Sequence, residues 1–340
     1  MNIDYYIASA IIIAIGAITA YIATPPLIRK LTKEGYVSPD QNKLGKPKVP
    51  KFGGIALMLG FTLAVLVALQ LRSSTLNFVL MLAALCSTIL ISFLGLLDDV
   101  LHVPDRYRVL LPAFAALPLM VTKAGTSTMN FVFFTVNFDL GIYTLPLLGP
   151  VDINLYPLLL VPIGVVACSN LVNLLAGFNG LEVGVGAIAS LYVFLAATVL
   201  YIQGYPTVEA ALIMAALFGA CVGFLFFNWF PARLFPGNIT TYLIGAAVVS
   251  AVVIGDMERV GVIALTPQIA EFFLKARSSF RAENFGKPDA RGRLHYDGPI
   301  YSLTHLVMRL LRPTEPQLVG ILLLLQVLFG SLALLSVFVR

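Results

Sequence analysis

Two adjacent carboxylates, Asp98 and Asp99, follow directly on the apolar run 93–97, and Arg106 and Arg108 come within the next ten residues. A charge at the boundary of a bilayer is unfavourable unless water, an opposite charge or a metal ion lies beside it. The pair therefore predicts either a helix end capped in water or a site that handles ions. Where the other unusual polar residues fall decides between the two.

A second group of polar side chains lies at the end of another apolar run. Asn170 and Asn173 are three residues apart, so on a helix both point to one side. Asn179 then begins a turn with a glycine, and Glu182 opens the next apolar run. Amide oxygens suit a hard cation such as Mg²⁺. Hydrogen bonding between helices is the structural alternative.

A third group precedes the apolar run that starts at Ile239. Gly237 and Asn238 place a polar side chain and backbone N–H groups at the expected helix start, and Gly53-Gly54 does the same for an earlier run. Such helix starts suit phosphate groups. The basic segment 275–315 is the longest polar stretch and includes an amphipathic piece at 300–311, which fits a membrane surface.

The composition indicates what positions these groups. Hydrophobic residues make up 59% of the 340 residues and charged residues 11%, against roughly 25% charged in a soluble domain. We therefore predict an all-α polytopic membrane protein. Runs of roughly 17–25 apolar residues predict ten transmembrane helices, which lie near 5–28, 53–71, 77–97, 107–122, 154–176, 183–203, 207–230, 239–255, 259–275 and 316–339. Pro112 and Pro118 predict a kink in the fourth.

The basic residues orient these spans. With the N-terminus outside, 18 of the 22 lysines and arginines lie on inside loops, as cytoplasmic loops require. This predicts a single integral-membrane domain over 1–340 in the cell membrane, with both termini outside. Its active-site loops, near 29–52, 98–106, 177–182, 231–238 and 276–315, then share the cytoplasmic face. A small β-hairpin over 131–145, turning at 137–141, is expected on the outer side.

Three stretches carry a family resemblance. They are Phe-Leu-Gly-Leu-Leu-Asp-Asp-Val-Leu from Phe93, Asn-Leu-Val-Asn-Leu-Leu-Ala-Gly-Phe-Asn-Gly-Leu-Glu from Asn170, and Asn-Trp-Phe-Pro-Ala-Arg-Leu-Phe-Pro-Gly from Asn228. In this order they resemble the signature loops of the polyprenyl-phosphate N-acetylhexosamine-1-phosphate transferases, of the glycosyltransferase 4 type. The nearest branch is the archaeal and eukaryotic dolichyl-phosphate N-acetylglucosamine-1-phosphate transferases. The resemblance covers nearly the whole chain.

The resemblance implies a reaction. UDP-N-acetylglucosamine and dolichyl or another polyprenyl phosphate would give a lipid diphospho-N-acetylglucosamine and UMP, with Mg²⁺ as cofactor and Mn²⁺ as a substitute. This is the committing step of lipid-linked glycan assembly. The implied partners are the two substrates and the lipid bilayer. The sequence supports no nucleic-acid partner, and a homodimer is left open.

The resemblance also assigns roles to residues. Asn173 matches a Mg²⁺ ligand, Asn179 a uracil-contacting asparagine and Phe235 an aromatic that stacks on uracil. Asp98 and Asp99 would position the nucleophile or hold Mg²⁺, with Asp98 as a base in a lesser alternative. Asn238 stands where relatives have an aspartate, which removes a charge from a metal ligand. The remaining candidates are Arg108 and Arg281 for the pyrophosphate, with Arg277, Arg291 and Arg293 as alternatives to Arg281, and Asn170, Glu182 and Lys43 for substrate contacts.

Two rival functions are weighed. A run of adjacent histidines, found in the branch that makes peptidoglycan precursors, is absent here, because the histidines are His102, His295 and His305. This argues against a muramoyl-pentapeptide substrate but leaves another UDP-N-acetylhexosamine donor as an alternative. A secondary transporter would carry its polar residues near the middle of the bilayer. Here they gather at one face.

Overall fold

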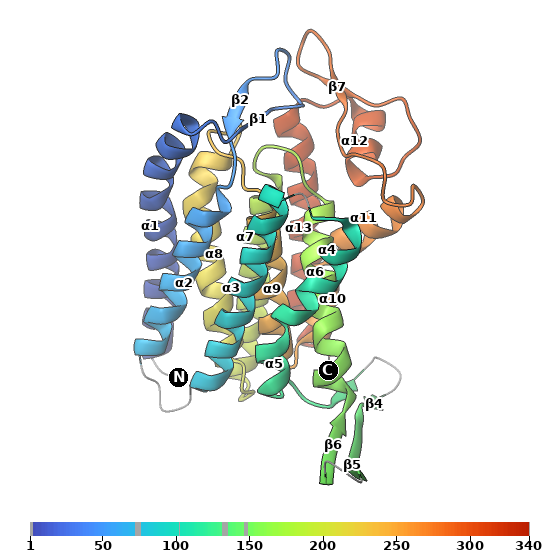
Figure 1. The fold of residues 1–340 in the computed structure, drawn as a ribbon. Helices are drawn as coiled ribbons and strands as arrows, with labels where there is room; N and C mark the ends of the chain where they lie inside the picture. Colours follow the sequence, from blue (N-terminus) through green and yellow to red (C-terminus); the bar gives the residue numbers. More distant parts are fainter. Residues whose placement is uncertain (1–2, 72–75, 102, 131–134, 146–148, 340) are drawn as a thin grey trace.

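The computed structural model describes residues 3–71, 76–101, 103–130, 135–145 and 149–339, and these form a bundle of helices with small two-stranded sheets at its ends (Figure 1). Within these described ranges, six helices are long and apolar enough to cross a membrane. They are α1 (Ile3–Lys33), α3 (Phe78–Leu101), α6 (Val161–Leu174) with the π-helical turn Tyr156–Leu160 before it, α7 (Leu181–Ile202), α8 (Val208–Asn228) and α13 (Glu315–Ser336). The chain is therefore a mostly helical, multi-pass membrane protein.

The other four predicted spans are shorter or interrupted. Two are the apolar helices α2 (Gly54–Gln70) and α9 (Asn238–Ile254). The expected kink in the fourth is a break at Ala116 between α4 (Asp105–Ala115) and α5 (Leu117–Val121), where Pro118 is the second residue of α5. The span 259–275 is also broken, into α10 (Glu258–Ala264) and α11 (Thr266–Ala276). We did not predict this break, although Pro267 accounts for it because proline begins a helix more readily than it continues one.

Helix α9 is the centre of the bundle. Every residue from Ile239 to Ile254 is buried, and α3, α6 and α8 all pack against it. Helices α1 and α8 also approach closely because α8 has glycines at the crossing. A Cβ on Gly223 would lie 2.1 Å from the carbonyl oxygen of Ala17. Small residues that let backbones approach are the usual device of packed membrane helices.

The polar segments gather at one end of this bundle. The sheet formed by β1 (Val37–Pro39) and β2 (Lys48–Pro50) lies there, as do β7 (Lys287–Pro288), β8 (Leu294–His295) and α12 (Leu303–Leu311). The two chain ends and the hairpin of β5 (Asp139–Leu145) and β6 (Gly149–Asn154) lie at the opposite end (Figure 1). The amphipathic piece predicted at 300–311 is α12, which buries His305 and Met308 and exposes Leu310 and Leu311.

We predicted a single hairpin over 131–145 that turns at 137–141, and the position of this turn is wrong. Strands β3 (Thr128–Asn130) and β4 (Thr135–Asn137) form one antiparallel pair, and β5 (Asp139–Leu145) and β6 (Gly149–Asn154) form another. The stretch 137–141 therefore links two hairpins. Its Asn and Asp do bend the chain locally, because Asn137 Oδ1 accepts the N–H of Asp139 and Asp139 Oδ1 accepts the N–H of Gly141. Residues 131–134 of the predicted hairpin lie outside the described residues.

Candidate functional site

Asp98 and Asp99 meet the start of α9. Asp98 is 3% exposed, and its Oδ2 accepts a hydrogen bond from Asn238 Nδ2 at 2.8 Å. Asp99 is half-buried, and its Oδ2 accepts from the backbone N–H of Asn238 at 2.7 Å. Both carboxylates of α3 therefore bind one residue of α9, and the N–H groups of that helix start favour their negative charge. Burial disfavours the charge of Asp99, and the ammonium of Lys51, which also lies over the Phe52 ring, offsets a small part of that cost.

Two glycines make this approach possible. A Cβ on Gly95 would lie 2.7 Å from the carbonyl oxygen of Asn238, so the last turns of α3 can touch α9 only without a side chain there. Gly237 has φ +73°, and a Cβ on it would lie 2.5 Å from Asp99 Oδ2. The carboxylate geometry therefore depends on the absence of side chains at both positions.

We expect Gly237→Ala to lower turnover about tenfold or more, because Asp99 must move and displaced catalytic groups lose rate steeply. The control is Gly35→Ala. Gly35 has φ +78° but nothing within 4 Å of a Cβ, so it carries the backbone strain alone. Turnover and melting temperature of both purified variants separate the two effects. Equal turnover in Gly237→Ala and Gly35→Ala would show that contact with Asp99 is irrelevant.

Asn173 joins the same cluster through Thr241. The Thr241 hydroxyl lies 3.1 Å from Asn173 Oδ1 and 3.2 Å from the carbonyl oxygen of Asn238, within hydrogen-bonding distance of both. The helix α6 thus brings its asparagine to the first turn of α9. Asn170, one turn earlier, donates its Nδ2 to the carbonyl oxygen of Val166 within α6 at 2.8 Å. The structure therefore brings Asp98, Asp99, Asn173 and Asn238 to one place.

The donor set of this cluster fits a hard divalent cation. Its oxygens are two carboxylates and two amides, which are the ligands that Mg²⁺ accepts. Asn238 turns its amide nitrogen to Asp98, which leaves the amide oxygen for another partner. Among the described residues, no group of three His, Cys, Asp or Glu side chains forms a metal site by itself. Any metal here would therefore depend on the asparagines as well as on the acids.

The helix start at Gly53-Gly54 is already bonded, contrary to the expectation of N–H groups open to phosphate. Both N–H groups donate at 2.8 Å, that of Gly53 to the carbonyl oxygen of Phe235 and that of Gly54 to the carbonyl oxygen of Pro236. The N–H of Phe235 donates in turn to the carbonyl oxygen of Pro50 at 2.8 Å. These bonds hold the segments 50–54 and 235–236 together beside the two aspartates. Phe235 is half-buried.

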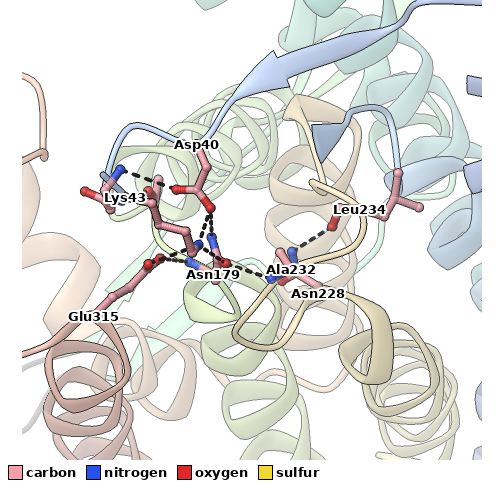
Figure 2. A network of polar contacts seen from close by, with 9 residues as sticks. Asp40, Lys43, Asn179, Asn228, Ala232, Leu234 and Glu315 are labelled. Atoms are coloured by element: carbon pink, nitrogen blue, oxygen red, sulfur yellow. Dashed lines mark hydrogen bonds and ion pairs between the residues drawn. The ribbon is translucent and has the colours of Figure 1, made fainter. Parts of the chain in front are cut away.

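Asn179 is the centre of a second polar cluster (Figure 2). Its Oδ1 accepts from Lys43 Nζ at 2.6 Å and from the N–H of Ala232 at 2.8 Å, and its Nδ2 donates to Asp40 Oδ2 at 3.1 Å. Its own N–H donates to Glu315 Oε1 at 2.8 Å. Asn179 is 3% exposed. Because both of its carbonyl lone pairs are engaged within the protein, this arrangement leaves its amide oxygen no capacity for a ligand donor.

The loop before Asn179 is held by buried side chains from three segments. Glu182 Oε1 accepts the N–H of Gly177 at 2.7 Å, and Asn42 Nδ2 donates to the carbonyl oxygen of Gly177 at 2.8 Å. Asn284, from the long last loop, donates to the carbonyl oxygens of Leu174 and Ala176. Glu182, predicted as a substrate contact, therefore fixes the backbone of this loop. A loop held on both sides is preorganised for whatever it binds.

The arginines of the last loop are exposed and lie close to this end of the bundle. Arg281 is three residues from Asn284, which attaches the loop to the end of α6. Arg277 places its guanidinium over the Tyr301 ring at 5.9 Å. The backbone N–H groups of Arg293 and Arg291 both donate to Asp289 Oδ1, which lowers the pKa of that carboxyl. Arg108 lies in the first turn of α4, and its side chain is outside the described residues.

Three residues of these clusters were not predicted. Thr241 links the two asparagines, and Asp40 and Glu315 bind Lys43 and Asn179. Thr241 had a sequence signal, since it lies three residues after Asn238 on the same helix face. Asp40 and Glu315 had none, because a single acid in a polar loop or at a helix start looks like a cap.

Sequence comparison gives the class of enzyme to which this membrane bundle, with its clustered acids and asparagines, belongs, and that class is the phosphoglycosyltransferases. The model of the family described as "Glycosyl transferase family 4" matches residues 81–256, and the chain belongs to this family. A relative from Saccharolobus solfataricus is 36% identical over 95% of both chains, and it carries the provisional name UDP-N-acetylglucosamine–dolichyl-phosphate N-acetylglucosaminephosphotransferase.

Two further relatives carry the names of two different activities. A UDP-N-acetylglucosamine–dolichyl-phosphate N-acetylglucosaminephosphotransferase from Dictyostelium discoideum is 27% identical over 75% of this chain and 68% of its own length. A phospho-N-acetylmuramoyl-pentapeptide-transferase from Thermodesulfovibrio yellowstonii is 28% identical over 76% of this chain and 75% of its own length. Both the dolichyl and the peptidoglycan branches are therefore related to this chain.

Proposed function

We propose that this protein transfers N-acetylglucosamine-1-phosphate from UDP-N-acetylglucosamine to dolichyl or another polyprenyl phosphate and releases UMP. The observation that carries the proposal is the cluster of Asp98, Asp99, Asn173 and Asn238 at the polar end of a membrane bundle. A reaction between a lipid in the bilayer and a nucleotide in water needs a site at such an end. The identity of 36% to a relative with this activity in its name supports the same substrates.

The chemistry is a displacement at phosphorus. An oxygen of the lipid phosphate bonds to the β-phosphorus of the donor, the bond from that phosphorus to the bridging oxygen breaks, and UMP leaves. Repulsion between the two anions is the main obstacle, so stabilising charge supplies most of the catalysis. The second pKa of a phosphate monoester is about 6, so the lipid phosphate is largely dianionic at pH 7 and needs no strong base.

We assign a separate role in this reaction to each group of residues. Asp98 and Asp99 position the attacking phosphate or hold a cation, and Asn173 and Asn238 would complete an oxygen site for Mg²⁺, or for Mn²⁺ in its place. When bound, the metal neutralises charge on the diphosphate. Arg281, with Arg277, Arg291, Arg293 and Arg108 as further candidates, clamps the diphosphate through guanidinium contacts. Phe235 lies at the nucleotide end with Lys43 and Asn170, and Asn179 and Glu182 shape this end by holding the loop 177–182 through their hydrogen bonds within the protein.

The same proposal includes the topology of ten membrane passes. Helices α2 and α9 have 17 residues each, which at 1.5 Å per residue is about 25 Å, near the thickness of the hydrocarbon core. The pairs α4–α5 and α10–α11 make one pass each. The polar end, including 29–52, 98–106, 177–182, 231–238 and 276–315, then faces the cytoplasm. The termini and the hairpin of β5 and β6 face outward, and 1–340 is one membrane domain.

Labelling of single cysteines tests this topology. Cysteines replacing Lys48 and Ala290, both exposed at the polar end, should react only with a reagent inside the cell. A cysteine replacing Ile142, 72% exposed on the hairpin, should react only with a reagent outside. The background is a variant in which Cys86, Cys168 and Cys221 are serine. If Lys48 and Ala290 label from opposite sides, the single-site model fails.

A donor comparison tests the substrate. Purified protein with dolichyl phosphate and Mg²⁺ should release UMP from UDP-N-acetylglucosamine, and mass spectrometry should find the lipid diphospho-sugar. UDP-N-acetylgalactosamine and UDP-N-acetylmuramoyl-pentapeptide are the alternative donors, the second because of the relative in the peptidoglycan branch. Faster release from either would replace the proposed sugar while keeping the reaction type.

A further inference from the structure

The start of α13 touches two different loops through two adjacent residues. Thr314 forms an isolated antiparallel bridge with Arg293, and the N–H of Leu294 donates to the carbonyl oxygen of Pro313 at 2.8 Å. The next residue, Glu315, accepts the N–H of Asn179 at 2.8 Å. The start of α13 therefore fixes the spacing between the arginine segment 291–293 and the loop 177–182, which contains Asn179.

Glu315 also acts on Asn179 through Lys43. Its Oε2 lies 3.3 Å from Lys43 Nζ, and that ammonium donates to Asn179 Oδ1 at 2.6 Å (Figure 2). Lys43 pairs with Asp40 as well. The network thus holds the Asn179 backbone from one side and the Asn179 amide from the other.

The charges make this network hard to rearrange. Asp40 and Glu315 are 2% and 3% exposed, and among the described side chains both pair with the same ammonium, that of Lys43. A buried carboxylate that loses its only cation is strongly unfavourable, so the three side chains hold one another in place. Such a fixed arrangement is what a binding site needs to select one geometry of its ligand.

We propose that Glu315 is a positioning residue for the nucleotide diphosphate of the donor, acting through Asn179, Lys43 and the segment 291–293. This inference rests on the proposed function, in which Asn179 lies at the nucleotide end and an arginine at the diphosphate. Both ends belong to one donor molecule, so the spacing that Glu315 sets governs the affinity for that molecule. Asp98, Asp99 and Asn238 form a separate hydrogen-bonded cluster, so the chemical step itself is unaffected.

The test compares Glu315→Gln with Gln317→Ala. Gln317 Oε1 accepts the N–H of Thr314 at 2.9 Å, so its loss weakens the start of α13 without touching Asn179. Glu315→Gln should raise KM for UDP-N-acetylglucosamine about tenfold, the change that 1.4 kcal/mol of lost binding produces. The kcat and the KM for dolichyl phosphate should stay within about twofold of the wild type. Gln317→Ala should lower the melting temperature and raise the donor KM by no more than about twofold, because it loosens Thr314 but keeps the bonds of Glu315 to Asn179 and Lys43.

Coupling with Lys43 gives a second readout. Lys43→Met leaves two buried carboxylates without their ammonium, so it should impair donor binding more than Glu315→Gln. In the double variant one of those charges is gone, and the donor KM should be lower than the product of the two separate effects predicts. If the two substitutions raise the donor KM independently, so that their effects multiply, the proposed network is overturned. An unchanged donor KM in Glu315→Gln would overturn it too, as would a donor KM that rises equally in Gln317→Ala.

Binding of UDP separates this inference from the proposed function. Calorimetry on the full chain in detergent measures UDP affinity without turnover, and Glu315→Gln should weaken it about tenfold, matching the KM. A wild-type protein that binds UDP but transfers no sugar phosphate would overturn the proposed function alone. If Glu315→Gln then binds UDP as tightly as the wild type, the positioning role is overturned as well.

Discussion

Asp98→Asn and Asp99→Asn are each expected to reduce turnover at least ~100-fold, the scale of losing one positioned electrostatic group. The hydrogen bonds explain why so small a change is severe. Asp98 Oδ2 accepts from Asn238 Nδ2, and Asp99 Oδ2 accepts from the N–H of Asn238. Asparagine removes the negative charge. If its NH₂ group occupies the position of Oδ2, it also faces an N–H group of Asn238, and two donors cannot form a hydrogen bond with each other. Initial rates at saturating substrates measure the effect.

The matched control is Asp139→Asn. Asp139 Oδ1 also accepts a backbone N–H, that of Gly141 at 2.8 Å, but it lies on β5 at the opposite end of the bundle. The turnover of Asp139→Asn should stay within about twofold of the wild type. The substitution is at an exposed position, where such changes alter stability by only about 0.5 kcal/mol, so neither the site nor the fold should be affected. Near-native turnover in Asp98→Asn or Asp99→Asn would mean that the carboxylate only caps the helix contact between α3 and α9.

Asn238 is expected to set the metal dependence. Asn238→Asp removes the amide that donates to Asp98 and puts a third carboxylate beside two others. Without metal the repulsion should lower the melting temperature, and Mg²⁺ should restore it because the ion neutralises the excess charge. The variant should keep activity and reach half-maximal rate at a lower Mg²⁺ concentration. Asn238→Ala should raise that concentration and slow turnover, each at least about tenfold.

Two measurements check this expectation. Initial rate against Mg²⁺ at saturating donor is compared for the wild type and both variants, and melting temperature is measured with and without Mg²⁺. Thr240→Val is the control for packing at the same helix turn, since it keeps the shape of Thr240 and removes a hydroxyl that donates to the carbonyl oxygen of Pro236. An unchanged Mg²⁺ dependence in Asn238→Ala would remove Asn238 as a ligand and leave Asn173 as the asparagine at the metal.

The central site could be predicted because its residues lie where helices start or end. Asp98, Asn173 and Asn238 are polar residues at the ends of apolar runs, and the orientation that the lysines and arginines give to the spans puts these three ends at the same face. The structure brings them together through Thr241 and the start of α9. The glycines that allow the contact, Gly95 and Gly237, are present in the sequence, but their close neighbours are not visible there.

The second cluster could not be predicted in the same way. Asp40, Asn179 and Glu315 lie far apart in the chain, and their pairing depends on how three loops fold over one another. Local patterns also failed for the hairpins. Asn137 and Asp139 have the turn preference that we used, yet pairing of β3 with β4 and of β5 with β6 places that bend between two hairpins. Strand pairing overrode the local signal.

The transfer of sugar together with its phosphate is the central claim, and labelled donor tests it most directly. UDP-N-acetylglucosamine carrying ³²P at the β-phosphorus is incubated with the purified protein, dolichyl phosphate and Mg²⁺. We expect the label to pass to the lipid fraction in equal amount to the unlabelled UMP released, with Asp98→Asn transferring at least ~100-fold more slowly. Label that stays in water as UDP, with sugar on the lipid, would contradict the account, because the sugar would then move without its phosphate.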